Sequence, residues 1–224
     1  MYTLKKSLGQ HFLKDESVIV RIVEALKKDA CEQLLEVGPG AGALTKELIL
    51  LPGVSFKAVE LDEEKVTYLK KKYPVLQEKI ISSSFLDIQV PFKGNFTVIG
   101  NFPYNISTQI LFKILEWKEQ VPVVIGMFQK EVAERAAAQS GSKTYGVLSA
   151  LIQAYYEVEY LFDVPPECFN PPPQVMSGVI RLVRKRESLA YKSEKLYWLV
   201  VKTAFRTGIS VAGTTKPSCI IFFQ

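Results

Sequence analysis

The amino-acid sequence predicts an α/β fold with a mostly parallel sheet. Three observations indicate it: short apolar runs alternate with stretches of helical periodicity, the first run stops at a cluster of glycines, and the second run closes on an acid. Strands that alternate with helices form βαβ units, which build a parallel sheet covered by helices. We therefore expect a Rossmann-like domain that binds its ligands at the carboxyl ends of the strands.

The individual elements follow from the spacing of apolar residues. Short apolar runs predict strands at 33–37, 54–59, 79–82, 96–100, 121–128, 157–164 and 177–183. Helical spacing predicts helices at 16–28, 43–50, 63–73, 107–117, 130–138 and 146–155. Ser107 or Thr108 is expected to cap the fourth of these helices, because serine and threonine hydroxyls accept from free backbone amides.

Composition narrows the class of protein. The 224 residues contain no apolar run of the roughly 18 residues that a membrane-spanning helix needs, and the first residues lack the apolar core of a signal peptide. We therefore expect a cytoplasmic protein without a membrane partner. Three distant cysteines and a single histidine argue against a disulfide framework and a metal site. The net charge of +5 and pI of 8.9 are compatible with a polyanionic partner.

The first motif is a glycine-rich segment, residues 36–42 (EVGPGAG), directly after the first strand. Glycines there allow a tight turn and a close approach of backbone to ligand. Glu60 ends the second strand, about 20 residues on, where an acid accepts hydrogen bonds from ribose hydroxyls. This pattern indicates an adenosine-type cofactor, and it does not choose between NAD and S-adenosylmethionine.

The second motif is residues 101–104 (NFPY), at the end of the fourth strand. An exocyclic adenine amine is a poor nucleophile, because its lone pair is delocalised into the ring. The side-chain oxygen of Asn101 and the carbonyl of Pro103 are candidates to accept from that amine and to align it with a methyl donor. Tyr104 offers a face on which the base can stack.

Two further segments bear on the site. Residues 165–173 hold five prolines, so that Phe169 lies on a stiff loop, either as the second wall of a base slot or as an ordinary core aromatic. Residues 7–13 (SLGQHFL) read as a polar loop anchored by an apolar pair, and His11 within it as a surface or satisfied polar group.

As an ordered set, these motifs resemble the bacterial small-subunit rRNA adenine-N6,N6 dimethyltransferase family. The resemblance covers roughly residues 3–205 and is carried by residues 9–13 (GQHFL), 36–40 (EVGPG), 101–107 (NFPYNIS), 129–132 (QKEV) and 169–173 (FNPPP). It implies a Rossmann-like, S-adenosylmethionine-dependent methyltransferase domain over residues 1–205. The implied partner is small-subunit rRNA within a pre-ribosomal particle, and we expect the enzyme to act as a monomer.

The resemblance also implies a role for each site residue. His11 and Leu13 would contact the cofactor, Gly38 would lie near its methionine part, and Glu60 would hold its ribose. Asn101 would mark the transfer site. The base would then lie between Tyr104 and Phe169.

The sequence departs from the family pattern at Ser84, which stands where the family has an acid that contacts the cofactor adenine. A serine accepts one hydrogen bond there without charge. Asp87 lies three residues too late to take over this role unless the backbone shifts.

A second departure lies in the tail, residues 206–224, where the family continues with a basic helix and a small helical domain. The tail has no amphipathic period, so we expect it to pack poorly beside a closed core over residues 7–200. Two functions stay open: an active dimethyltransferase, or an impaired remnant that binds cofactor or RNA. A NAD-dependent oxidoreductase is disfavoured, because no acid/base pair for hydride transfer is recognisable.

Overall fold

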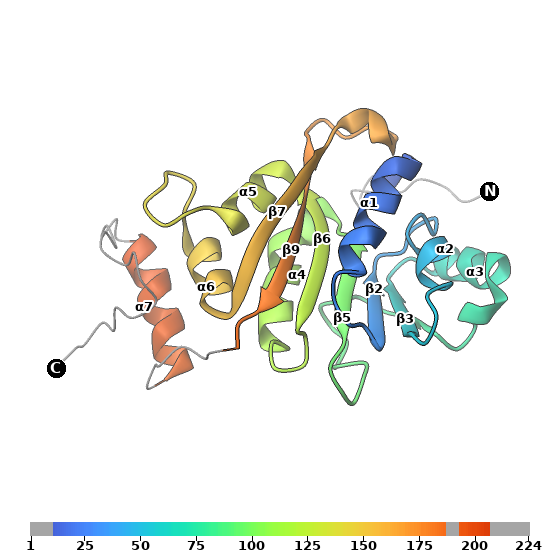
Figure 1. Ribbon diagram of the computed structural model, residues 1–224, viewed down its shortest axis with the longest axis horizontal. Helices are drawn as coiled ribbons and strands as arrows, with labels where there is room; N and C mark the ends of the chain where they lie inside the picture. Colours follow the sequence, from blue (N-terminus) through green and yellow to red (C-terminus); the bar gives the residue numbers. More distant parts are fainter. Residues whose placement is uncertain (1–10, 187–192, 207–224) are drawn as a thin grey trace.

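A computed structural model describes residues 11–186 and 193–206 of the chain. Within these ranges the main sheet has seven strands in the order β4-β3-β2-β5-β6-β9-β7 (Figure 1). The strands are β2 (Gln33–Val37), β3 (Ser55–Glu60), β4 (Ile80–Ser82), β5 (Thr97–Asn101), β6 (Val123–Gln129), β7 (Tyr156–Val164) and β9 (Ser177–Arg184). The first five are parallel to one another, whereas β9 runs antiparallel to both β6 and β7. The mostly parallel sheet predicted from the sequence is confirmed.

Helices cover both faces of this sheet, as expected for βαβ units. One face packs against α1 (Glu16–Leu26), α2 (Thr45–Leu48) and α3 (Glu63–Lys72). The opposite face packs against α4 (Ser107–Glu116), α5 (Lys130–Ala137) and α6 (Val147–Tyr155), and α7 (Glu194–Arg206) lies on the outer side of α6 (Figure 1). The central strands β2, β5 and β6 are buried along almost their whole length, because parallel strands lie between two helical layers.

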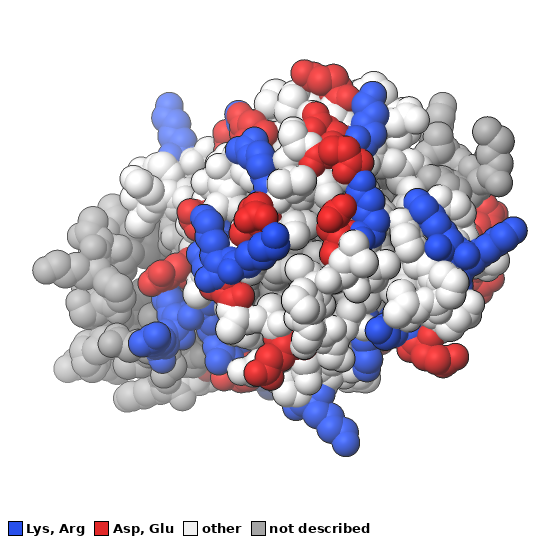
Figure 2. All heavy atoms as spheres, turned by 45° about the vertical axis from the view of Figure 1, so that its right-hand side comes forward, with Lys and Arg blue, Asp and Glu red and all other residues white. Residues whose placement is uncertain are grey.

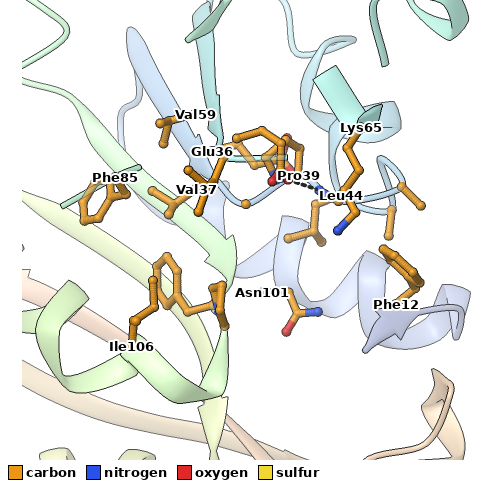
Figure 3. Close-up of a pocket in the computed structure, with 18 of the residues that line it drawn as sticks. Phe12, Glu36, Val37, Pro39, Leu44, Val59, Lys65, Phe85, Asn101 and Ile106 are labelled. Carbon is orange, nitrogen blue, oxygen red and sulfur yellow. Dashed lines mark hydrogen bonds between the residues drawn. The ribbon is translucent and has the colours of Figure 1, made fainter. Parts of the chain in front are cut away.

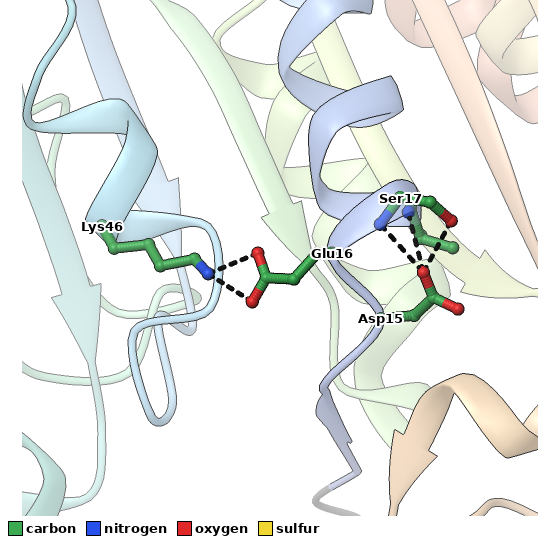
Figure 4. A network of polar contacts seen from close by, with 5 residues as sticks. Asp15, Glu16, Ser17 and Lys46 are labelled. Carbon is green, nitrogen blue, oxygen red and sulfur yellow. Dashed lines mark hydrogen bonds and ion pairs between the residues drawn. The ribbon is translucent and has the colours of Figure 1, made fainter.

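Polar contacts hold the first helix in place (Figure 4). The Asp15 carboxylate caps α1 by accepting from the backbone amides of Ser17 and Val18, at 2.9 and 3.3 Å. Glu16 forms an ion pair with Lys46 of α2 at 2.5 Å. Exposed ion pairs contribute little free energy, so the position of α1 depends mainly on its buried apolar face.

A small antiparallel pair that was not predicted joins two distant parts of the chain. β1 (Phe12–Leu13) pairs with β8 (Phe169–Asn170). The backbone amide of Lys14 also donates to the carbonyl of Cys168 at 2.9 Å. This pairing places the segment after residue 10 beside the proline loop.

Two local predictions need correction. The helix expected at 43–50 is only the four residues of α2, because residues 41–44 form turns. Neither Ser107 nor Thr108 caps α4: the capping position is Ile106, which has no side-chain hydrogen bond. A 3-10 turn, Tyr104–Ile106, runs directly into α4, so Ser107 is already helical.

The remaining predicted elements match observed ones to within a few residues, and α7 was not predicted. The first part of the GQHFL motif and the tail beyond Arg206 lie outside the described residues. None of the described helices has the length and apolar character that crossing a membrane requires.

Candidate functional site

The candidate site is a cavity of about 210 Å³ at the carboxyl ends of the parallel strands (Figure 3). Segments that follow β2, β3, β4 and β5 all line it, because parallel strands end at the same edge of a sheet. The segment with β1 closes another side. Eight of the nine predicted site residues line the cavity: His11, Leu13, Gly38, Glu60, Ser84, Asn101, Pro103 and Tyr104.

The glycine-rich segment forms the wall after β2. Gly40 has a φ of +58°, a conformation that residues with a Cβ rarely adopt. A Cβ at this position would also lie 3.3 Å from the ring of Phe12, so the glycine lets β1 approach the loop. The Gly40 amide donates to Glu60 Oε2 at 3.1 Å, which ties the loop to the end of β3.

Glu60 is buried, and its carboxylate is already organised by the backbone. Oε2 accepts from the Gly40 amide, and Oε1 accepts from the Asp62 amide at 3.0 Å. A carboxylate offers about four acceptor positions, so Glu60 still has capacity for a ligand.

Glu36 is a cavity residue to which the sequence analysis gave no role. It is 2 % exposed, and the hydroxyl of Thr45 donates to its Oε2 at 2.7 Å. Burial, helped by the nearby carboxylate of Glu60, raises the pKa of Glu36 to about 8. The signal that could have identified it is an acid within a buried apolar strand, two residues before the first glycine.

Asn101, the last residue of β5, holds the centre of the site (Figure 3). Its Nδ2 donates to the backbone carbonyl of His11 at 3.1 Å. This contact fixes the orientation of the amide, and within the described residues Oδ1 accepts no hydrogen bond from protein. The described residues thus leave the side-chain oxygen unengaged, and its role as acceptor of the adenine amine stays a prediction.

The carbonyl of Pro103 behaves differently from its expected role as a free acceptor. It accepts from the Ile106 amide at 3.2 Å and from the Ser107 hydroxyl at 3.1 Å. Both of its lone pairs are thus used inside the turn. In this structure Pro103 shapes the turn, so of the two acceptors predicted from the NFPY motif only the Asn101 oxygen is left unengaged by the described residues.

The ring of Tyr104 is held at its face and at its tip. The His11 ring stacks on it with centroids 5.6 Å apart and planes at 29°. Its hydroxyl is hydrogen-bonded to that of Ser177 at 2.5 Å. Burial raises the pKa of the Tyr104 hydroxyl, against an opposing effect of this hydrogen bond. His11 is fixed in turn, because its Nδ1 lies 2.9 Å from the carbonyl oxygen of Pro171.

Phe169 is the predicted site residue that the structure does not bring to the cavity. Its side chain is 1 % exposed and packs in the apolar core that includes the buried face of α1. Its backbone pairs with Leu13, so the loop approaches the site through main-chain contacts. Here Phe169 is a core aromatic, which the sequence had left as an alternative.

Two cavity residues carried no sequence signal. Lys65 is buried, with its Nζ 5.0 Å from the Phe12 ring centroid, although it lies in a helix that reads as a charged surface helix. Leu61 also lines the cavity directly after Glu60, yet it is exposed. Lys65 and Leu61 line the cavity because the fold brings the end of β3 and the start of α3 close to β1.

Comparison with known proteins agrees with this geometry. A glycine loop, a strand-end acid and an Asn-Phe-Pro-Tyr turn around one cavity, on a sheet with β9 inserted antiparallel, define a Rossmann-like methyltransferase. The sequence profile of the family described as ribosomal RNA adenine dimethylase matches residues 1–208. The chain belongs to this family, as its motifs predicted.

Individual relatives support the same assignment. The chain is 52 % identical to ribosomal RNA small subunit methyltransferase A of Flavobacterium johnsoniae, over 90 % of this chain and 78 % of the relative. It is 50 % identical to the protein of the same name from Cytophaga hutchinsonii, over 90 % and 79 %.

Solved structures agree as well. A dimethyladenosine transferase from Plasmodium falciparum superimposes with a TM-score of 0.77 and 26 % identity, over 88 % of this chain and 71 % of that one. The 23S rRNA methyltransferase ErmE superimposes with a TM-score of 0.75 and 27 % identity, over 89 % and 80 %.

Proposed function

We propose that this chain transfers methyl groups from S-adenosylmethionine to N6 of two adjacent adenines in small-subunit rRNA. The observation that carries the proposal is Asn101: its amide nitrogen is held by the His11 carbonyl, and its free oxygen stands at the cavity beside the glycine loop. Family membership supports the class of reaction.

The cavity suits an adenosine-type cofactor with a positive charge. Glu60 has acceptor capacity for ribose hydroxyls, and Gly38 leaves room for the methionine part to approach the backbone. The buried carboxyl of Glu36 favours a cationic ligand nearby, because positive charge offsets the cost of its ionisation. Ser84 would meet the adenine, while His11 and Leu13 would cover the cofactor from the side of β1.

The cofactor supplies an electrophilic methyl group on its sulfonium sulfur. The chain's part is to present the adenine amine. Asn101 Oδ1 accepts a hydrogen bond from N6–H, which directs the N6 lone pair at the methyl carbon. The cofactor's sulfur would keep the electron pair of the C–S bond that breaks, and the methylated N6 would give up its proton to water. A second transfer to the same nitrogen completes dimethylation.

The base is held by stacking. The half-buried ring of Tyr104 offers the adenine a flat surface with a fixed tip. A base must leave its stack to reach such a slot. The proposed contact of Phe169 with the base requires a rearrangement of the proline loop, because its ring lies in the core. We further propose that the enzyme works in the cytoplasm, as a monomer on a pre-ribosomal particle.

The test is transfer of tritiated methyl groups to small-subunit particles that lack these modifications. Incorporation that maps to two adjacent N6,N6-dimethyladenines is the expected result. Calorimetry on the purified protein used in this assay should show binding of S-adenosylhomocysteine and no binding of NAD. Cofactor binding without incorporation would support the impaired remnant instead, and tight NAD binding alone would reject the proposal.

A further inference from the structure

Ser177 is a buried serine that the sequence analysis did not single out. It is the first residue of β9 and has no exposed surface. Its hydroxyl is hydrogen-bonded to that of Tyr104 at 2.5 Å. A residue distant in sequence thus contacts the tip of the ring that faces the cavity.

The two ends of this contact differ in how firmly they are held. β9 pairs with β6 and β7 at this point, with Gln129 opposite Ser177 on one side and Val164 on the other. Tyr104 lies instead in a 3-10 turn between β5 and α4. The sheet is therefore the rigid partner, and the turn is the part that needs an anchor.

Each of the two hydroxyls has the other as its hydrogen-bond partner. Within residues 11–186 and 193–206, neither the Tyr104 nor the Ser177 hydroxyl has a second partner. A buried hydroxyl without a partner costs free energy, so the pair is strongly favoured over either group alone. With His11 on the ring face and Ser177 at the tip, the plane of the ring is defined by two contacts.

We propose that Ser177 is a positioning residue for methyl transfer: it holds the Tyr104 hydroxyl and thereby sets the plane against which the target adenine stacks. The inference rests on the proposed function, because it assumes that Tyr104 receives the base. Ser177 acts through Tyr104 and touches neither base nor cofactor. Its loss should therefore lower the rate of transfer and leave cofactor affinity unchanged.

A double-mutant cycle tests this coupling. Ser177→Ala, Tyr104→Phe and the double variant are compared with wild type by single-turnover methylation of undermethylated small-subunit particles. Each single variant should slow transfer about tenfold, the effect of one hydrogen bond between neutral groups. The double variant should be no slower than either single one, because all three lack the same contact. Binding of S-adenosylhomocysteine should stay within about twofold of wild type in every case.

Ser149→Ala is the matched control. Ser149 is equally buried, its hydroxyl donates to the Arg135 carbonyl and accepts from the Gly146 amide, and none of these residues lines the cavity. It should lower the melting temperature without changing the rate.

The possible results distinguish the role of Ser177 from the proposed methyltransferase function. If Ser177→Ala fails to fold, Tyr104→Phe still removes the hydrogen bond from the other side, and wild-type rates in that variant would overturn the inference. Rate losses that multiply in the double variant would overturn it as well. No incorporation by the wild type would overturn the proposed function, and this inference with it.

Discussion

Asn101 uses the two ends of its amide for different purposes. Nδ2 donates to the His11 carbonyl and fixes the side chain, so that Oδ1 can act on the substrate. Because the oxygen is proposed to act on the amine in the transition state, Asn101→Ala should lower kcat about 100-fold or more. Cofactor affinity should change by no more than a few-fold. Single-turnover methylation and calorimetry measure the two quantities.

The matched control for Asn101 is Asn95→Ala, an exposed asparagine in the turn before β5. It should leave both quantities unchanged. Near-normal turnover of Asn101→Ala would refute the role of the amide.

Ser84 is the residue at which the sequence analysis expects a departure from the family's pattern. It lines the cavity, and its Oγ accepts from the Leu86 amide at 3.2 Å, a bond that an aspartate in its place can also accept. Ser84→Asp adds a charged acceptor for the cofactor adenine. Binding of S-adenosylhomocysteine should tighten by about five- to thirtyfold, the difference between a hydrogen bond to a charged acceptor and one to a neutral hydroxyl.

Ser82→Asp, at the exposed end of β4, is the control for an added charge on this segment and should not alter affinity. Unchanged or weaker binding by Ser84→Asp would show that the loop after β4 is aligned wrongly with the family.

At the scale of elements, the packing between β5 and β6 positions the catalytic turn. Gly126 of β6 lies under the rings of Phe102 and Phe128, and a Cβ there would overlap both. Gly126→Ala should lower the free energy of unfolding by about 2 kcal/mol through overpacking. It should also slow methylation, because Phe102 directly follows Asn101.

Chemical denaturation measures this loss of stability. The control is Gly94→Ala, whose Cβ would find its nearest neighbour 3.8 Å away, in Gln33. Equal stability of the two variants would show that the Phe102 and Phe128 rings can yield without cost.

At the scale of the whole molecule, Glu36 links stability to pH. Its pKa is about 8 in the folded protein against a reference of 4.5, so between these pH values the folded chain holds a proton that the unfolded chain has lost. This carboxyl therefore makes stability fall as pH rises through that window. Glu36→Gln removes the effect, so its melting temperature relative to wild type should rise between pH 5 and pH 8.

Thermal unfolding across this range tests the linkage. Glu78→Gln, which removes an exposed acid, is the control for the loss of one charge. A constant difference between Glu36→Gln and wild type would contradict the linkage.

The net charge of the whole molecule bears on its affinity for RNA. The net charge of +5 attracts an RNA polyanion only modestly, and acidic side chains lie among the basic ones on the face that Figure 2 shows. Fusion of a basic helical domain after residue 205 should therefore strengthen binding to small-subunit particles. It should also steepen the salt dependence, because more counterions are released. Dissociation constants measured over a series of salt concentrations test this, and an unchanged slope would place the RNA contacts within residues 1–205.

Much of the fold was predictable because βαβ units are local. Each strand and its following helix carry their own apolar period, and the glycine loop, Glu60 and Asn101 mark where strands end. Since parallel strands end at one edge, the sequence also predicted that these residues meet. Errors concerned details that neighbours decide, such as the length of α2 and the cap of α4.

The α/β class, the family and eight of the 25 residues that line the cavity were predictable from the sequence, because these depend on local periodicity and on motifs near strand ends. The side of the cavity on which each residue lies could be seen only in the folded protein. The tertiary structure turned Phe169 into the core, engaged the Pro103 carbonyl, and brought Ser177 to Tyr104. These outcomes depend on contacts between segments far apart in the chain, and β1 with β8 and β9 with β6 bring those segments together.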